Sequence, residues 1–368
     1  MKGATLITGA DGYIGLKLAR QLLAEGDEQL VLAVRALPGS PAFDDKRVRL
    51  EYELGDAAAG RVTVVPADLS GEDAFAALEP DAITRIVHAA AVTKYNVPRD
   101  LAQSVNIDGT ARLAAFASRC DNLQRLALLS TLHTAGKHTG DVAEQRHEDR
   151  GFVNNYEWSK WAAEELLWTR YPDLPLSVLR LPTVISEDEG GRVVQHNSFH
   201  NTLKLYYYGL LSLVPGDRSC LQYVTPATFA IPAIAHLLDP AVPPGVYHVS
   251  PADEGVAPLD DLVEIVFGVF ESDRNYQRRG LLRPIYCDQE SFDDLVIASR
   301  ALRAGPVYEA IDSITPFAHQ MYLPKTFRND RLRAVWPGYR APDPAELVAT
   351  VARGLVASRW GRNQEEDR

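Results

Sequence analysis

A glycine-rich turn near the N-terminus constrains this 368-residue sequence more than any other feature. Gly9, Gly12 and Gly15 follow a β-rich apolar run at Ala4–Thr8, and a helical repeat of apolar residues begins at Ile14. Such a turn lets the backbone approach a phosphate closely, and the following helix supplies N–H donors and the positive end of its dipole. Its position at the first strand–helix junction therefore predicts a nucleotide-binding site.

Strand-like and helical segments alternate through the first half of the sequence. The expected strands are Ala4–Thr8, Leu30–Val34, Val62–Val65, Arg85–Ala90, Leu126–Ser130 and Ser177–Leu181. This alternation predicts an α/β fold, a doubly wound parallel Rossmann sheet with helices on both faces. We expect residues 1–186 to form the nucleotide-binding domain and residues 187–368 a smaller, mainly helical substrate lobe. One strand-like run near 246–249 is expected to return to the main sheet.

Charge and composition exclude several classes of protein. The chain has 49 acidic and 38 basic residues, a net charge of −11, so it lacks the basic field that nucleic-acid binding needs. Three scattered cysteines without a CxxC pair argue against a disulfide framework and for a reducing compartment. With no targeting segment visible, we expect a cytoplasmic protein. The longest uncharged stretch, Ser219–Leu238, contains two prolines and several hydroxyls, which favours buried strand and helix over a membrane span.

Further motifs follow the glycine turn in a characteristic order. They are Asp68-Leu69, His88-Ala89-Ala90-Ala91, Asn106-Ile107-Asp108-Gly109-Thr110, Ser130-Thr131 and Tyr156-x-x-x-Lys160. The sequence resembles an extended short-chain dehydrogenase/reductase. Within that family the segments 88–96, 151–157 and 246–249 are similar to the thioester reductase and fatty-acyl reductase subgroup, and the resemblance covers about residues 4–250.

The resemblance implies a nicotinamide cofactor and the residues that would bind it. They are Gly9, Asp11, Gly12, Tyr13, Ile14, Gly15, Arg35, Asp68, Leu69, Ala89, Ala90, Ala91, Lys160, Pro182 and Thr183. Arg35 ends the second strand, where an acidic residue would bind the ribose 2′-OH of NADH. A guanidinium there suits a 2′-phosphate, so we expect NADPH (NADP+). The alternative is that Arg35 is only a solvated strand end.

The Tyr-x-x-x-Lys motif carries the expected chemistry. On a helix Tyr156 and Lys160 stand one turn apart on the same face. An ammonium beside a phenol lowers the phenol's pKa toward the range of a general acid/base. The resemblance adds Thr131, which would donate to the developing oxyanion, and Asn106, which with Lys160 would join the site to a proton relay. The alternative, an ordinary surface Tyr/Lys pair, is disfavoured by the preceding motifs.

We therefore expect an NAD(P)-dependent oxidoreductase that reduces a carbonyl or acyl-thioester carbon. The substrate is expected as a small molecule or as an acyl thioester of a carrier protein or coenzyme A. Because the sequence begins at the first strand, any carrier is expected as a separate protein. A nucleotide-sugar epimerase or dehydratase is the nearest alternative, but Leu132-His133 stands where a dehydratase has Asp-Glu. A non-catalytic NADP-sensing protein is the other, but both Tyr156 and Lys160 are retained.

Aromatic and histidine clusters leave alternatives open. The segments 206–208 and 267–270 are expected either to line an apolar substrate channel or to form the core of the smaller lobe. Trp158, Trp161 and Trp168 suit packing against the sheet or another subunit, and the resemblance includes dimers formed through the Tyr156 helix. His196 and His200 lack a third ligand nearby, so no metal site is expected.

A local arginine cluster departs from the acidic balance. Its members are Arg274, Arg278, Arg279 and Arg283, and helical spacing would present them as two pairs. Arginine binds phosphate in a bidentate manner, and carrier proteins and coenzyme A both present phosphate. The cluster is thus a candidate docking site, with a solvated loop as the alternative.

Overall fold

Seven parallel strands form the central sheet of the computed structural model, which describes residues 3–72, 74–252, 255–302 and 304–360. Their order is β11-β7-β5-β4-β1-β2-β3. They are β1 (Ala4–Thr8), β2 (Gln29–Val34), β3 (Val62–Pro66), β4 (Ile83–His88), β5 (Arg125–Thr131), β7 (Leu176–Leu181) and β11 (Gly245–His248). The expected Rossmann fold is confirmed, and so is the return of the 246–249 strand, since β11 lies parallel to β7.

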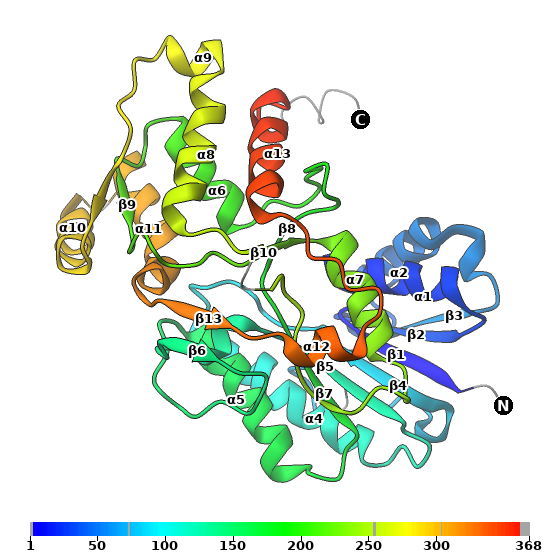
Figure 1. The fold of residues 1–368 in the computed structure, drawn as a ribbon. Coiled ribbons are helices and arrows are strands. Elements are labelled where there is room, and N and C mark those ends of the chain that lie inside the picture. Colours follow the sequence, from blue (N-terminus) through cyan, green and yellow to red (C-terminus); the bar gives the residue numbers. More distant parts are fainter. Residues whose placement is uncertain (1–2, 73, 253–254, 303, 361–368) are drawn as a thin grey trace.

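Helices cover both faces of this sheet (Figure 1). The helices α1 (Tyr13–Glu25), α2 (Pro41–Leu54), α7 (Ala227–Leu237) and α12 (Asp330–Val335) share one core cluster, and α4 (Asp108–Ala117) and α5 (Asn155–Arg170) share another. Strand side chains alternate between the two, so Ile7 packs in the first cluster and Leu6 in the second. The chain order reverses between β1 and β4, and in such sheets ligands bind at the carboxyl ends of the strands beside this point.

The remaining helices form a lobe with a core of its own beside the sheet (Figure 1). They are α6 (Ser198–Tyr207), α8 (Leu259–Glu271), α9 (Arg274–Gln277), α10 (Gln289–Leu302), α11 (Pro306–Ala318) and α13 (Pro344–Ala357). The one-turn helix α3 (Arg99–Ala102) lies instead beside α5. Below, the six helices α6, α8, α9, α10, α11 and α13 are called the C-terminal lobe.

Three short parallel strand pairs join distant segments, and the sequence did not predict them. They are β6 (Gly140–Val142) with β13 (Lys325–Phe327), β8 (Thr183–Ser186) with β10 (Val224–Pro226), and β9 (Leu213–Pro215) with β12 (Ile285–Cys287). The first pair matters for the site, because it carries a segment near the C-terminus back to the loop that follows β5.

The long uncharged stretch forms strand and helix as expected. It contains β10, directly followed by α7, whose residues are largely buried against α1. Within the part of the chain that the structure describes, no helix is both long enough and apolar enough to cross a membrane.

Candidate active site

The glycine turn between β1 and α1 has the conformation that its sequence predicts. Gly9 adopts a φ of +66°, and a Cβ built there would lie 2.8 Å from the backbone of Ala90. A Cβ on Gly15 would lie 2.4 Å from the carbonyl oxygen of Gly9. Gly12 donates its N–H to that same carbonyl at 3.0 Å. The turn therefore tolerates no side chain at Gly9 or Gly15 without backbone movement.

A cavity of about 250 Å³ opens beside this turn, and we call it the nucleotide-side cavity. Predicted cofactor residues that line it are Gly9, Asp11, Gly12, Arg35, Asp68, Leu69, Ala89, Ala90 and Ala91. Tyr13, Ile14 and Gly15 form the first turn of α1 beside it. The side chain and N–H of Ser70 hold the pKa of the Asp68 carboxyl below its usual value, with a smaller effect of Arg35. The sequence motifs thus converge on one cavity at the switch point of the sheet.

Lys46 of α2 joins Arg35 in the lining of the nucleotide-side cavity, and Arg49 of the same helix contacts Asp11 beside it. Sequence reasoning missed both residues. The Lys46 ammonium lies 2.6 Å from the Asp11 carboxylate and donates to the Arg35 carbonyl at 3.0 Å. Arg49 donates to the Asp11 carbonyl at 3.0 Å. The basic spacing in 46–49 was visible, but only the fold places α2 next to the end of β2.

A second cavity, of about 200 Å³, extends from the sheet into the C-terminal lobe, and we call it the lobe cavity. Its apolar lining includes Leu203 and Tyr206 of α6, Leu262, Val266 and Phe267 of α8, and Ile314 and Phe317 of α11. Its polar lining includes Tyr95, His133, Thr183, Gln320 and Lys325. Pro182 and Thr183, which were expected at the cofactor, line this cavity.

The aromatic segments are divided between the lobe cavity and the core of the C-terminal lobe, and a substrate channel stays a prediction. Tyr206 and Phe267 line the lobe cavity. Tyr207 and Phe270 pack edge to face at 5.2 Å in the core of the C-terminal lobe. Tyr208 packs on the ring of Trp360, with centroids 6.4 Å apart.

Thr131 and Tyr156 meet between the sheet and α5. Thr131 ends β5, and its hydroxyl interacts with the phenol of Tyr156 in the first turn of α5. That turn is fixed by Asn154, whose side chain accepts the Glu157 N–H at 2.9 Å. The ring of Tyr95 stands edge-on to Tyr156, with centroids 5.7 Å apart. The phenol is thus held at the strand end next to a wall residue of the lobe cavity.

Lys160 does not contact this phenol. Its ammonium donates instead to the Leu129 carbonyl at 2.8 Å, and burial lowers the pKa of Lys160 to about 8. Burial raises the pKa of Tyr156 to about 12, although the Thr131 hydroxyl opposes this shift. The expected lowering of the Tyr156 pKa is therefore absent from this structure, because burial dominates and the Lys160 ammonium is turned to a carbonyl.

Asn106 joins the loop after β4 to α5. It lies on a π-helical turn, Gln103–Ile107, and its Oδ1 accepts the Val92 N–H at 2.8 Å. Its Nδ2 donates to the Val92 carbonyl at 3.0 Å and to the Ser159 hydroxyl at 2.9 Å. The geometry gives Asn106 a positioning role, and its part in a proton relay stays a prediction.

A buried ion pair behind the site was also missed. Arg180 of β7 and Glu164 of α5 pair at 2.6 Å with both side chains almost fully buried. Arg180 keeps the pKa of the Glu164 carboxyl below its usual value despite burial, and the Glu164 carboxylate also accepts the Ser130 hydroxyl. Since Glu164 lies one turn after Lys160 and beside β5, it holds the helix and the strand that carry the predicted site. Arg180, a charged residue within the largely apolar run of β7, was the sequence signal that could have indicated this ion pair.

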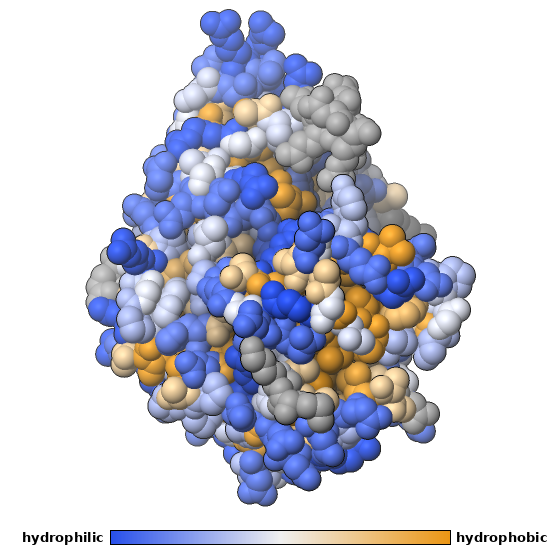
Figure 2. Space-filling model, turned by 90° about the vertical axis from the view of Figure 1, so that its right-hand side faces the viewer, coloured by the Kyte–Doolittle hydropathy of each residue, from blue (hydrophilic) through white to orange (hydrophobic). Residues whose placement is uncertain are grey.

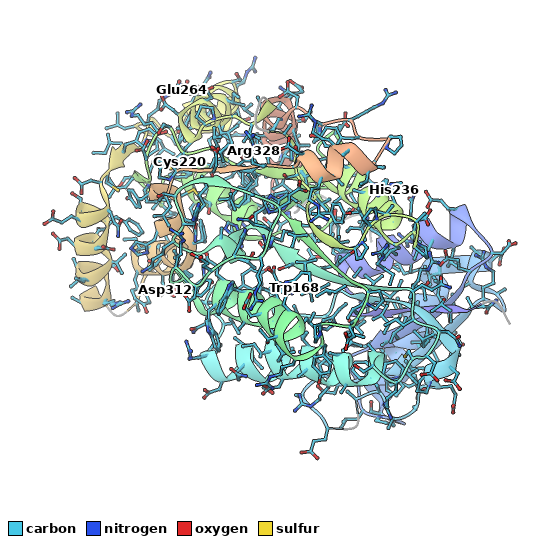
Figure 3. The ribbon with its side chains drawn as sticks, turned by 60° about the horizontal axis from the view of Figure 1, so that its bottom comes forward. Trp168, Cys220, His236, Glu264, Asp312 and Arg328 are labelled. Carbon is cyan, nitrogen blue, oxygen red and sulfur yellow. The ribbon has the colours of Figure 1, made fainter. Side chains whose placement is uncertain are left out.

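The histidines and tryptophans have packing roles. His200 accepts the Asn197 N–H at 3.0 Å as part of the α6 cap, and its other ring nitrogen lies 2.8 Å from the Ile185 carbonyl. Across the described ranges, no group of three His, Cys, Asp or Glu side chains is placed to hold a metal ion. Trp158 stacks under the Arg99 guanidinium, and Trp168 packs in the core cluster of α4 and α5, away from Glu264 on α8 (Figure 3).

The arginine cluster is divided by the structure. Arg279 donates to the Tyr207 carbonyl at 2.7 Å and lies over the rings of Tyr207 and Tyr208. Arg283 pairs with Glu264 at 2.6 Å and with Glu271 at 2.5 Å. Arg274 and Arg278 are exposed at the tip of the C-terminal lobe, where Figure 2 shows a hydrophilic surface. All four arginines are exposed, but only Arg274 and Arg278 are left without such contacts within the lobe, among the described residues.

Comparison with known proteins identifies the family. The male sterility protein family matches residues 7–234, and the chain belongs to it. Isonitrile lipopeptide synthase of Streptomyces coeruleorubidus is 28% identical over 244 residues, 63% of this chain and 16% of that protein. Alcohol-forming fatty acyl-CoA reductase of Simmondsia chinensis is 23% identical over 347 residues, 73% of this chain and 70% of that protein. The chain thus spans about a sixth of the synthase.

Solved structures with the same fold include reductases and epimerases. The terminal R domain of the myxalamid PKS-NRPS pathway superimposes with a TM-score of 0.76 at 19% identity, over 97% of this chain and 91% of that one. A UDP-galactose 4-epimerase superimposes with a TM-score of 0.61 at 15% identity, over 97% of this chain and 100% of that one. Family, fold and motifs together place the chain in the thioester reductase-like subgroup of extended short-chain dehydrogenases/reductases, with a site for a nicotinamide cofactor.

Proposed function

We propose that this protein is an NADPH-dependent reductase that delivers hydride to the carbonyl carbon of an acyl thioester, with Thr131, Tyr156 and Lys160 at the reacting centre. These residues line neither cavity themselves, and the proposal is carried by their interactions toward both. Tyr156 contacts Tyr95, which lines the lobe cavity. Lys160 acts electrostatically on His88, directly before Ala89–Ala91 of the nucleotide-side cavity.

The nucleotide-side cavity fits a dinucleotide phosphate. Gly9 and Gly12 line the cavity without side chains, and the start of α1 beside it suits a phosphate, since a helix N-terminus supplies N–H donors. Arg35 and Lys46 supply positive charge at the end of β2, which suits a 2′-phosphate and supports NADPH. When bound, the nicotinamide supplies the hydride.

The chain's own groups handle the oxygen and the proton. The Thr131 hydroxyl interacts with the Tyr156 phenol, so both hydroxyls can turn to one substrate oxygen as it gains negative charge. With its pKa raised to about 12, the Tyr156 phenol carries its proton at neutral pH and can donate it to that oxygen. The product of a thioester is a hemithioacetal, which releases the thiol and leaves the aldehyde. Lys160 can move from the Leu129 carbonyl toward the phenol and restore its proton.

The similarity to a fatty acyl-CoA reductase and to an R domain supports a thioester, and the apolar lining of the lobe cavity supports an acyl chain. An aldehyde or ketone reductase is the second candidate, because the same groups would protonate an alkoxide.

The test is a panel of matched substrates with NADPH: a medium-chain acyl-coenzyme A, the corresponding aldehyde, a ketone and a nucleotide sugar. We expect NADPH consumption and aldehyde formation with the thioester. Tyr156→Phe should lower turnover at least about 100-fold, the range of general-acid catalysis, with NADPH affinity retained. Tyr171→Phe, at the other end of α5, is the matched control and should keep wild-type turnover.

Conversion of the nucleotide sugar without net NADPH consumption, with thioester and aldehyde inert, would favour the epimerase alternative. Wild-type turnover in Tyr156→Phe would refute the assigned chemistry.

A further inference from the structure

A buried lysine of the lobe cavity has no role in the chemistry above. Lys325 lies on β13 and is 8% exposed. Its ammonium donates to the Gly136 carbonyl at 2.7 Å and to the side-chain oxygen of Gln320. An ammonium has three N–H donors, so one N–H of Lys325 has no hydrogen-bond acceptor among the described residues. Since Lys325 lines the cavity, this N–H is available to a bound molecule.

The ammonium is balanced by a carboxylate beside the predicted catalytic tyrosine. Gln320 donates at 2.8 Å to Glu157, which follows Tyr156 and is fully buried. Glu157 also accepts the Val153 N–H at 3.1 Å and the Asn154 amide at 3.0 Å. Burial raises the pKa of Glu157 and lowers that of Lys325, and each charge opposes the other's shift.

Stability alone is a weak reason for this arrangement. Desolvating two charges costs several kcal/mol, and a well-packed apolar pair of similar volume is often as stable or more so. The bridging Gln320 keeps the two charges apart, which lowers their mutual attraction. A ligand that uses the remaining N–H gives the buried lysine a function that packing does not.

The surroundings of Lys325 define what it can bind. Among the described residues that line the lobe cavity, it has the sole ammonium or guanidinium, and no carboxylate is present. Burial and Lys325 lower the pKa of His133 to about 4, so this imidazole is neutral at physiological pH. Much of the remaining lining is apolar. The cavity therefore suits a chain that is mostly hydrocarbon and carries one oxygen acceptor.

We propose that Lys325 binds an oxygen on the acyl chain of the substrate, which makes the enzyme selective for hydroxy- or oxo-acyl groups over plain alkanoyl groups. This inference rests on the proposed function, because it takes the lobe cavity as the acyl site. A plain alkanoyl chain offers no acceptor and leaves a buried N–H unpaired. The Tyr95 ring packs against both Tyr156 and His133, with centroid distances of 5.7 and 5.8 Å, and Lys325 acts electrostatically on His133. The recognised oxygen is thus on the chain beyond the reacting carbonyl.

Binding of unreactive analogues tests the inference without requiring turnover. The probes are cysteamine amides of one medium-chain acid, unsubstituted or with a hydroxyl or keto group at successive carbons, measured by calorimetry with NADP+ present. For at least one position the oxygenated amide should bind wild type about tenfold tighter, as expected for a hydrogen bond to a charged donor. We call the ratio of the affinities of the oxygenated and unsubstituted amides the preference. In Lys325→Met the preference should fall to near one, because the oxygenated amide binds more weakly.

A preference near one at every position in wild type, or one that persists in Lys325→Met, overturns the inference. Lys137→Met is the matched control, since Lys137 is exposed and adjoins Gly136, and it should keep the wild-type preference. If Lys325→Met fails to fold because Glu157 loses its counter-charge, the variant Glu157→Gln with Lys325→Met removes both charges and gives the same readout. Absence of thioester reduction with the preference intact would refute the proposed function alone.

Discussion

The nucleotide-side cavity and the lobe cavity are built from different parts of the polypeptide. The first is lined mainly by short residues at the carboxyl ends of neighbouring strands, such as Gly9, Ala33 and Ala67. The second is lined largely by long side chains from α6, α8 and α11. Short side chains leave main-chain groups exposed to the cavity, and such groups bind the parts shared by all dinucleotides. A cavity lined by long side chains changes shape when one of them is replaced, so the lobe cavity is where specificity for the substrate can vary.

Charge separates the cavities as well. Arg35 and Lys46 lie at the nucleotide-side cavity, whereas Lys325 is the basic residue among the described residues that line the lobe cavity. The first cavity therefore suits a multiply charged ligand, and the second suits an uncharged chain with one polar group.

The sharpest way to break this contrast is to reverse the charge at Arg35. Arg35→Asp removes a charge-assisted phosphate contact and supplies an acceptor for a ribose hydroxyl. We expect NADPH affinity to fall about 10- to 100-fold, the effect of losing a charged hydrogen bond of about 1.5–3 kcal/mol, and NADH to become the preferred cofactor. Titration of both cofactors by fluorescence measures the ratio.

The matched control is Arg47→Asp on α2, whose guanidinium faces Asp44 and Glu51. It should leave the ratio unchanged. Equal affinity of wild type for NADH and NADPH would contradict the role given to Arg35.

Much of the nucleotide side could be predicted because its determinants are local. The turn 9–15 and the strand ends at His88 and Thr131 are each encoded within a few residues, and parallel topology brings the strand ends together. The strand limits match the expected ones closely, although β4 ends at His88 rather than Ala90. Lys46 escaped prediction because its approach to Asp11 depends on how α2 packs.

The lobe cavity could not be predicted in the same way. Lys325 meets the Gly136 carbonyl because β13 pairs with β6, and the residues joined are almost two hundred positions apart. A short strand such as 325–327 has too little periodicity to be recognised. The expected fall in the pKa of Tyr156 failed for a similar reason. The motif indicates that Lys160 is near, but not that its ammonium is turned to Leu129.

A substitution in the lobe cavity tests whether this cavity holds the acyl chain. Val263 on α8 is half-buried and lines the cavity, so Val263→Phe should shorten the chain that fits. Excluding about two methylenes at about 0.8 kcal/mol each should raise KM for a long-chain acyl thioester by roughly tenfold. An acetyl thioester should be unaffected.

Val269→Phe is the control on the same helix, since Val269 is also half-buried but is not part of the cavity lining. It should change neither KM. Equal effects of Val263→Phe on long and short chains would place the acyl group elsewhere, and the contrast between the cavities would then lose its functional meaning.

The smallest expected effect concerns how an anionic substrate reaches the lobe cavity. Arg274 and Arg278 are exposed on and next to α9 and have no ion-pair partner among the described residues. Arg283 instead pairs with Glu264, and Arg279 donates to the Tyr207 carbonyl. In a chain of net charge −11 they can attract a phosphate-bearing carrier or coenzyme A only locally. The attraction should weaken as salt shortens the Debye length.

Replacing Arg274 and Arg278 together by Ala should raise KM for an acyl-coenzyme A about two- to fivefold, because exposed charges contribute about 0.2–1 kcal/mol each. A truncated thioester without phosphate should keep its KM, since the two arginines do not line the cavity. The control replaces Arg170 and Arg340, which are equally exposed on other elements, and should change neither value. The difference between the two substrates should vanish at high salt. If both thioesters respond alike, the arginines act on the fold of the lobe and not on the approach of the substrate.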